Sequence, residues 1–218
     1  MIRTCGATLL LLLAVRWSSA QSVKSKNEVS GNSSDDYVFR IHAALPDYSF
    51  HIRRDSGGEV EGIEVRRGTQ AQPIQILELT EDFDTAPRGI PMLAAEDVNF
   101  DGFADTKFMH WWGATGNTAY FYWLFDEDSG KFVYDDQFSQ LYNVTPDSSR
   151  HEIRTHSTTG AAGNSYTSQV FRFEGRKLVL LHEEKQDWNQ DKKCFYKVVQ
   201  QRSGKEMKTI SGECVKAQ

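Results

Sequence analysis

The sequence lacks most of the features that mark the common enzyme classes. It has only three cysteines and five prolines among 218 residues, and no CxxC pair that would indicate thiol redox chemistry. It also has no GxSxG nucleophile turn, no HExxH zinc motif and no phosphate loop ending in Lys-Ser/Thr. The scattered His110, His151 and His156 are more typical of packed or solvated side chains than of a catalytic set. These absences favour a protein that is not an enzyme.

Long hydrophobic runs are missing too. The apolar run 7–15 (ATLLLLLAV) has nine residues, far fewer than the roughly 20 that a helix needs to cross a bilayer. Arg3 precedes this run and the small residues 18–20 follow it, which is the pattern of a secretory signal peptide cleaved before Gln21. Cys5 lies before the run, where cleavage would not leave it to be acylated. We therefore expect residues 1–20 to be a signal peptide, and the exported chain to have no membrane span and no lipid anchor.

Basic residues are fewer than acidic ones. Cleavage removes Arg3 and Arg16 and no acid, which leaves 23 basic against 30 acidic residues and a net charge of −7. An acidic surface argues against nucleic acid and anionic membranes as partners, and favours cationic ones through electrostatic steering.

Cleavage also removes Cys5 and leaves Cys194 and Cys214. Two cysteines in an exported chain predict a disulfide, with two free buried thiols as the alternative. Closing a loop of about 20 residues would stabilise the fold by roughly 3 kcal/mol in the chain-entropy model.

The rest of the sequence is organised as short β-type runs. Residues 21–36 are polar and predict a disordered tether, so the single folded domain is expected over residues 37–218. No stretch has the apolar periodicity and caps of an amphipathic helix. The fold class is therefore all-β, with strands expected at Tyr48–Arg53, Val60–Arg66, Ile74–Leu79, Tyr120–Phe125, Gln169–Phe173 and Lys177–His182.

One short motif occurs twice. Residues 113–117 (GATGN) recur as residues 160–164 (GAAGN), 47 residues later, and each copy is followed by a β run, a turn and a Lys-hydrophobic run. This spacing suits a repeated unit the size of a propeller blade, and predicts a compact β-propeller-like array of antiparallel hairpins. A β-sandwich is the alternative.

The segment 97–105 reads D-x-N-x-D-G-x-x-D. Calcium prefers six to eight oxygen ligands, which alternate side chains around a tight turn can supply. The loop therefore predicts one structural calcium ion. Its ligands would be the side chains of Asp97, Asn99, Asp101 and Asp105 and the backbone carbonyl of Phe103. No Glu stands at position 12, as an EF-hand requires, and the pattern instead resembles the calcium loops of integrin-type propeller blades. A metal-free Asp/Asn/Gly turn is the alternative.

The segment Thr155–Tyr166 (THSTTGAAGNSY) is small, polar and rich in glycine. We expect a long surface loop, and such loops are often functional. Its low side-chain bulk would let it enter a narrow cleft. The hydroxyls of Ser165 and Tyr166 could then hydrogen-bond the carboxylates of a glycosidase. A plain connection between strands is the equally weighted alternative.

The combination resembles a known family. The run LAAE before the Asp-rich loop, the aromatic strands, the Gly/Ser loop ending in Tyr166 and VFRF at 170–173 resemble periplasmic lysozyme-inhibitor-like immunity proteins. Those proteins belong to bacteria that kill rivals by type IV secretion, and are related to inhibitors of invertebrate-type lysozyme. The resemblance covers roughly residues 50–184.

This resemblance implies a periplasmic, calcium-binding protein that inhibits a peptidoglycan hydrolase or lysozyme by inserting a loop into its glycan cleft. The inhibitory loop would comprise Gly160, Gly163, Asn164, Ser165 and Tyr166. The Ser-Gly-x-x-Tyr form found in several lysozyme inhibitors is not met, since Ser165 directly precedes Tyr166. A calcium-dependent adhesion or glycan-binding module without inhibitory activity is the alternative function.

Overall fold

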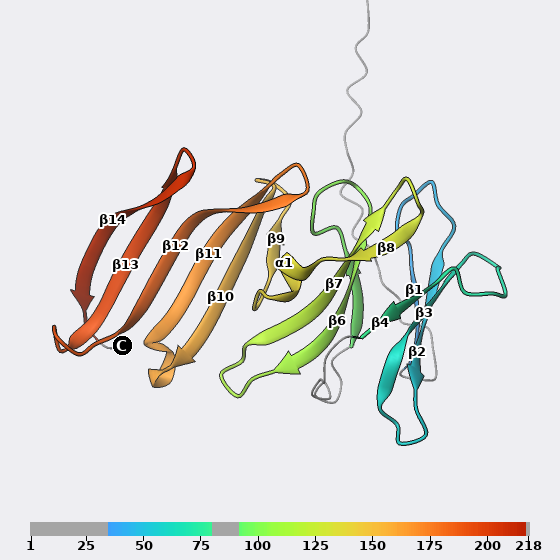
Figure 1. The fold of residues 1–218 in the computed structure, drawn as a ribbon, viewed down its shortest axis with the longest axis horizontal. Helices are drawn as coiled ribbons and strands as arrows, with labels where there is room; N and C mark the ends of the chain where they lie inside the picture. The colour runs from blue at the N-terminus through green and yellow to red at the C-terminus, as the bar shows by residue number, and fades with distance from the viewer. Residues whose placement is uncertain (1–34, 80–91, 217–218) are drawn as a thin grey trace, which may run out of the picture.

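The computed structural model describes residues 35–79 and 92–216 (Figure 1). The predicted signal peptide lies outside the described residues. So does the predicted tether, apart from Asp35 and Asp36, and Asp36 already begins the first strand.

The described chain forms three antiparallel sheets, each a meander in which neighbours in sequence are neighbours in space. Sheet A consists of β1 (Asp36–Phe39), β2 (Tyr48–Arg54), β3 (Val60–Arg67) and β4 (Gln75–Glu78). Sheet B consists of β5 (Leu93–Glu96), β6 (Asp105–Trp112), β7 (Thr118–Asp126) and β8 (Lys131–Tyr134). Sheet C consists of β9 (Thr145–Asp147), β10 (Glu152–Gly160), β11 (Ser165–Glu174), β12 (Lys177–Asn189), β13 (Cys194–Ser203) and β14 (Glu206–Val215).

Helical structure in the described residues is limited to two short turns. The helix α1 (Asp136–Ser139) follows sheet B and begins with the Asp135 side chain accepting from the Phe138 N–H, while the 3-10 turn η1 spans Ala161–Gly163. The all-β class is thus confirmed: five of the six predicted runs lie within a strand, and the run Ile74–Leu79 exceeds β4 by one residue at each end.

Two hydrophobic cores hold the sheets together. The first lies between sheets A and B and includes Tyr48, Phe50 and Ile52, which alternate along β2. The second lies between sheets B and C and includes Tyr122, Phe138, Ile153 and Phe171. Strand β7 contributes to both cores: Phe121, Trp123 and Phe125 lie in the first and Tyr122 lies in the second. This two-sided burial explains why the run YFYWLF shows no alternation of polar residues.

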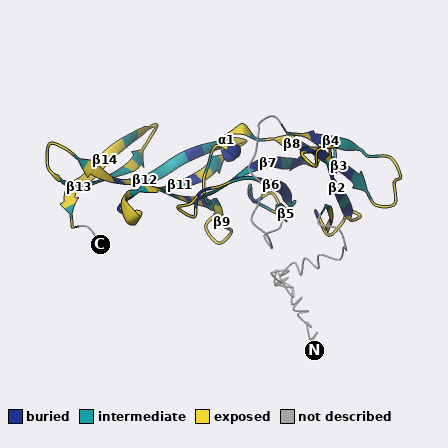
Figure 2. Ribbon diagram, turned by 90° about the horizontal axis from the view of Figure 1, so that it is seen from below, coloured by how far each residue is buried: buried dark blue, intermediate teal, exposed yellow. Residues whose placement is uncertain are grey.

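The described sheets do not close into a propeller. They stand in an open row, and the molecule is elongated rather than compact (Figures 1 and 2). Propellers typically use four to eight blades of four strands. Here three sheets are present, and the last one is widened to six strands. A simple two-sheet sandwich is not formed either, because sheet B packs on a neighbour through each of its faces.

The repeated motif has a structural counterpart. Residues 113–117 connect β6 to β7, and residues 160–164 connect β10 to β11, so each copy joins the second and third strands of its sheet. The β2–β3 turn occupies the same place in sheet A. All three turns lie on one side of the molecule, at the bottom of Figure 1.

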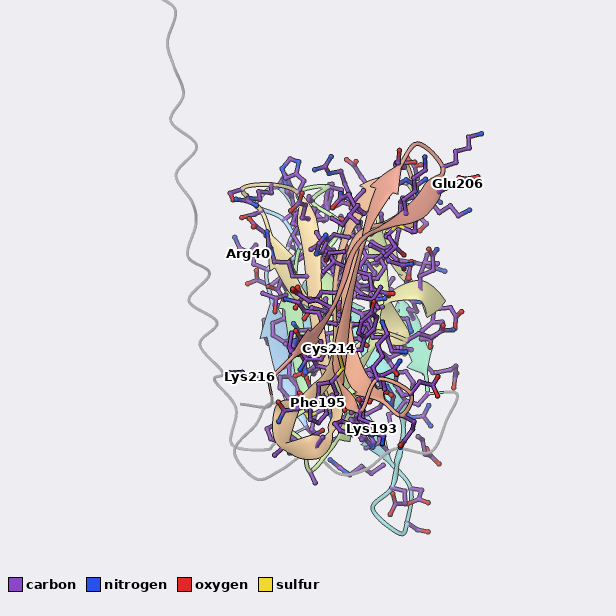
Figure 3. The ribbon with its side chains drawn as sticks, turned by 90° about the vertical axis from the view of Figure 1, so that its left-hand side faces the viewer. Arg40, Lys193, Phe195, Glu206, Cys214 and Lys216 are labelled. Carbon is purple, nitrogen blue, oxygen red and sulfur yellow. A yellow bond between two sulfur atoms is a disulfide. The ribbon has the colours of Figure 1, made fainter. Side chains whose placement is uncertain are left out.

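Strands β13 and β14 extend sheet C beyond the second core, and most of their residues are half-buried or exposed (Figure 2). The predicted disulfide Cys194–Cys214 is confirmed and joins these two strands, with 5.7 Å between the two Cα atoms. Figure 3 shows Cys214 toward one end of this hairpin and Glu206 at the other, where the chain turns. Such a bond is typical of proteins in oxidising compartments.

Candidate functional site

The segment predicted as a long loop is mostly strand. Thr155–Gly160 belong to β10 and Ser165–Tyr166 to β11, so only residues 161–164 form the connection. The prediction of a 12-residue loop was wrong. The Thr and Ser residues show no alternation of apolar side chains, so the sequence gives no sign of a strand. They nevertheless pair in register across the hairpin, as Thr158 does with Tyr166. The site is therefore a rigid hairpin with a short tip, called here the β10–β11 tip (residues 160–164).

The backbone of the β10–β11 tip is unusual. Four consecutive residues have positive φ: Gly160 (142°), Ala161 (50°), Ala162 (52°) and Gly163 (91°). For an alanine this left-handed conformation costs roughly 1–2 kcal/mol. Strain of this kind persists only where surrounding structure enforces it, and it concentrates at functional sites. Ala161, Ala162 and Gly163 are exposed, so the tip presents backbone and methyl groups to the solvent.

Buried polar groups fix the base of the tip. The Asn164 carbonyl accepts from Gln186 Nε2 at 2.8 Å, and the Asn164 amide donates to the Ala161 carbonyl at 3.0 Å. Ser165 Oγ donates to Asp187 Oδ1 at 2.9 Å, a bond that lowers the pKa of Asp187. Asn164, Ser165 and Gln186 are all buried. Each of these contacts ties the tip to itself or to β12.

Tyr166 lies behind the tip and not on it. Its hydroxyl donates to the Glu184 carboxylate, and its ring lies 5.5 Å from the His156 ring. Burial, together with the bond to Glu184, raises the pKa of Tyr166 to about 12. The tyrosine also lines a hollow of about 370 Å³ on the outer face of sheet C, with Ala162, Gly163, Asn164, Gln186, Lys197, Val215 and Lys216. The hydroxyl that was predicted to meet a partner is thus already engaged within the chain.

Two asparagines that the sequence analysis did not single out connect the β6–β7 and β10–β11 hairpins. Asn117 donates from Nδ2 to the Thr158 carbonyl at 2.8 Å and accepts the Thr158 N–H at 2.9 Å. Asn143 donates to the His156 carbonyl at 2.6 Å and accepts the Thr118 N–H at 2.8 Å. Asn117 is the last residue of the repeated motif, and that position was the signal that could have identified it. The two turns are thereby held at a fixed relative orientation.

The Asp-rich loop 97–105 connects β5 to β6 and is closed by its own side chains. Asp97 accepts the N–H groups of Asp101 and Gly102, and Asn99 accepts from Asp101 as well. Gly102 has a φ of 92°, which only glycine adopts without strain. Burial raises the pKa of Asp97, and the nearby Asp101 charge adds to this.

Asp105 anchors the Asp-rich loop through buried hydrogen bonds. It is 1% exposed, and its two carboxylate oxygens accept the N–H groups of Val98 at 2.9 Å and Phe125 at 2.8 Å. Burial, with smaller contributions from the Asp101 and Asp97 charges, raises its pKa to about 8. The residue therefore links the Asp-rich loop to the end of β7.

The oxygen atoms of this loop match part of the ligand set that a hard cation requires. Asp97, Asn99 and Asp101 place carboxylate and amide oxygens around one turn, which is the ligand chemistry that calcium prefers. Asp101 also lies close enough to raise the pKa of both Asp97 and Asp105, and no Lys, Arg or His of the described chain forms an ion pair with these three. However, no three His, Cys, Asp or Glu side chains within residues 35–79 and 92–216 are grouped as they would be to hold a metal ion.

The Asp-rich loop and the β10–β11 tip lie at opposite ends of the sheets (Figure 1). The loop shares a cleft with the β11–β12 turn, lined among others by Asn99, Asp101, Gly175 and Arg176. The tip precedes the first residue of β11, and this ten-residue strand spans roughly 30 Å. A cation in the loop would therefore not touch the tip.

Comparisons with known proteins identify the fold. No protein-family model matches the chain, and no curated protein matches it. Among solved structures, it is similar to one described as "Structure of a Xanthomonas Type IV Secretion System related protein", with a TM-score of 0.54 and 19% sequence identity. The match covers 83% of this chain and 95% of that chain. At this identity the likeness shows a shared fold.

No helix within the described residues is both long and apolar enough to span a membrane.

Proposed function

We propose that this chain is an exported inhibitor, of the immunity-protein type, that blocks a peptidoglycan hydrolase with the β10–β11 tip. The observation that carries the proposal is the tip itself: four successive residues with positive φ, two of them alanine, held by buried polar contacts.

Three further findings support this proposal. The sequence resembles lysozyme-inhibitor-like immunity proteins over roughly residues 50–184. The fold is similar to that of a protein described as related to a Xanthomonas type IV secretion system. The disulfide Cys194–Cys214 fits an oxidising compartment such as the periplasm.

The tip can occlude a cleft by shape. Because residues 160–163 carry at most a methyl group, the hairpin can enter a groove too narrow for larger side chains. The paired strands and the Asn117 contacts hold the tip in place, so little conformational entropy is lost on binding. Exposed backbone groups of the tip are then available to hydrogen-bond the carboxylates with which glycosidases act.

Tyr166 takes a supporting role in this mechanism. Its ring packs against His156, and its bond to Glu184 joins β11 to β12 directly behind the tip. We expect Tyr166 to position the tip and to contact the partner through the exposed part of its ring.

The Asp-rich loop would bind one calcium ion through Asp97, Asn99, Asp101, the Phe103 carbonyl and Asp105. Such an ion would offset the mutual repulsion of the three carboxylates and stabilise the connection between β5 and β6. Its role would be structural, because the loop is remote from the tip.

A lysis assay tests the function. Hydrolysis of peptidoglycan by c-type, g-type and invertebrate-type lysozymes and by bacterial muramidases is measured with and without the chain. We expect stoichiometric inhibition of at least one enzyme and its loss in Ala162→Trp, which adds bulk at the tip.

Two controls accompany this variant. Ala162→Gly adds no bulk and adopts positive φ without strain, and Ser56→Trp places the bulk of a tryptophan in the exposed β2–β3 turn. Both should inhibit like the wild type. Full inhibition by Ala162→Trp would remove the tip from the mechanism. Absence of inhibition by the wild type, combined with binding to purified peptidoglycan, would favour a glycan-binding module.

A further inference from the structure

A second surface lies beside the β10–β11 tip and carries exposed aromatic side chains. Trp111 and Trp112 end β6, and Tyr142 lies just before β9. Trp112 is 40% exposed and Tyr142 is 42% exposed, whereas most other aromatic side chains of sheet B are buried or half-buried. The Trp111 and Tyr142 rings meet edge to face, with centroids 5.5 Å apart. Trp111 and Trp112 are consecutive in β6, so their side chains leave opposite faces of sheet B. We call Trp111, Trp112 and Tyr142 the aromatic rim, because all three lie at the turn end of the sheet.

The aromatic rim is held rigidly. The Trp111 ring lies across Gly113, where a Cβ atom would be 2.2 Å from the ring, so only glycine fits. Asn143 follows Tyr142 and bonds both to Thr118 of β7 and to the His156 carbonyl of β10. The rim therefore has a fixed position relative to the β10–β11 tip, and the β6–β7 and β10–β11 turns lie on the same side of the molecule (Figure 1).

The β6–β7 and β10–β11 turns and the strand residues next to them carry no formal charge. Residues 108–125 and residues 155–171 contain no Asp, Glu, Lys or Arg, in a chain in which 25% of residues are charged. The exposed positions within these stretches are accordingly uncharged, among them Trp112, Ala114, Thr115, Ala161 and Ala162. Depletion of charge and enrichment of Trp and Tyr characterise the centre of protein–protein interfaces.

The ring geometry favours a protein over a sugar chain as the occupant. Sugars stack on flat, open ring faces. The outer end of the Trp111 ring abuts Gly113, and the Tyr142 ring stands at 67° to the Trp111 ring, so the two rings do not form one flat platform.

We propose that the aromatic rim is a second contact surface for the hydrolase that the β10–β11 tip blocks. Its rings would pack against an uncharged, apolar wall beside the glycan cleft of that enzyme. This inference rests on the proposed function and adds to it an anchor that lies outside the inserted tip.

The test uses the full chain and whichever enzyme of the lysis panel it inhibits most strongly, with affinity measured by calorimetric titration. The variants are Trp112→Arg, which places a charge in the rim, and Tyr142→Ala, which removes one ring of the rim. Tyr134→Ala is the matched control, because Tyr134 is a 39% exposed aromatic on β8 outside the rim. Melting temperatures are compared to establish that each variant is folded.

We expect each rim variant to bind at least about tenfold more weakly than the wild type, with Tyr134→Ala unchanged. If both folded rim variants bind like the wild type while Ala162→Trp does not, the rim inference fails and the proposed function stands. If the wild type inhibits no enzyme of the panel, the proposed function fails and the rim inference fails with it. Binding of the wild type to peptidoglycan alone, lost in Tyr142→Ala, would overturn the assignment of a protein partner.

Discussion

The Asp-rich loop and the β10–β11 tip are both short, glycine-containing connections, but they are stabilised in different ways. The loop is built from charged side chains that accept backbone N–H groups, and it is anchored by the buried Asp105. The tip is built from residues with almost no side chain, and its strained backbone is exposed.

This difference indicates a division of roles between the two ends of the molecule. Satisfying buried N–H groups contributes to folding stability, whereas a strained and exposed backbone costs stability, which fits the partner contact proposed for the tip. Changes at the loop should therefore affect unfolding, and changes at the tip should affect inhibition.

The largest effect is expected at Asp105. In Asp105→Ala the N–H groups of Val98 and Phe125 lose their acceptors in a buried environment, which should lower the free energy of unfolding by about 2–5 kcal/mol. Denaturant unfolding measures this, with Asp128→Ala in the exposed β7–β8 turn as the control. A loss below about 1 kcal/mol would contradict the anchoring role of Asp105.

The disulfide offers a comparison with a third region. Replacing Cys194 and Cys214 by serine opens a link between residues 20 apart, and should cost about 3 kcal/mol in the chain-entropy model. The same denaturation experiment applies. Because β13 and β14 lie outside both hydrophobic cores, hydrogen exchange should increase in this hairpin before it increases in sheets A and B. An equal increase in the rate of hydrogen exchange across all three sheets would show that the hairpin does not unfold locally.

Substitution of Asn117 should affect both folding stability and inhibition, because this residue connects the tip to sheet B. Asn117→Ala leaves the N–H and the carbonyl of Thr158 without their partner, at an expected cost of about 1–3 kcal/mol. Inhibition should also weaken several-fold, because the orientation of the β10–β11 hairpin is no longer fixed. Asn117→Asp should give at least as large a loss in both assays, because a carboxylate oxygen then faces the Thr158 carbonyl to which Asn117 donates. Unchanged inhibition by both variants would show that the tip does not depend on this link.

The smallest effect concerns the titration of Tyr166. Its pKa of about 12 lies above the ordinary value of about 10, so folding favours the neutral phenol. The contribution of this residue to stability is then complete below pH 10, and is lost as the pH rises from 10 to 12. The difference between the ultraviolet titrations of the wild type and Tyr166→Phe isolates this one phenol. A difference curve centred at pH 10 would show that the bond to Glu184 is not formed in solution.

The sequence predicted the elements of the fold better than their assembly. Runs such as 120–125 and the hairpin formed by 48–53 and 60–66 were identified because burial and turn residues leave a local pattern. Closure into a propeller could not be judged, because the number of sheets and the widening of sheet C by β13 and β14 are not local properties.

The candidate site was predicted in composition but not in geometry. The turn at 160–164 was singled out correctly, yet its strands were taken for a loop because Thr155 to Thr159 have polar side chains on both faces. The engagement of Tyr166 by Glu184 depends on the pairing of β11 with β12, and the role of Asn117 depends on contacts 41 residues away in the sequence. Neither can be read from spacing along the chain.

The most direct test of the division of roles compares two variants in one crossed experiment. Ala162→Trp and Asp101→Ala are each assayed for inhibition of the hydrolase and for melting temperature, with calcium and with chelator. We expect that Ala162→Trp loses inhibition and keeps the melting temperature of the wild type. We also expect that Asp101→Ala melts at a lower temperature, without a response to calcium, and inhibits fully while folded. Full inhibition by Ala162→Trp, or loss of inhibition by folded Asp101→Ala, would contradict the separation of stability and inhibition between the Asp-rich loop and the tip.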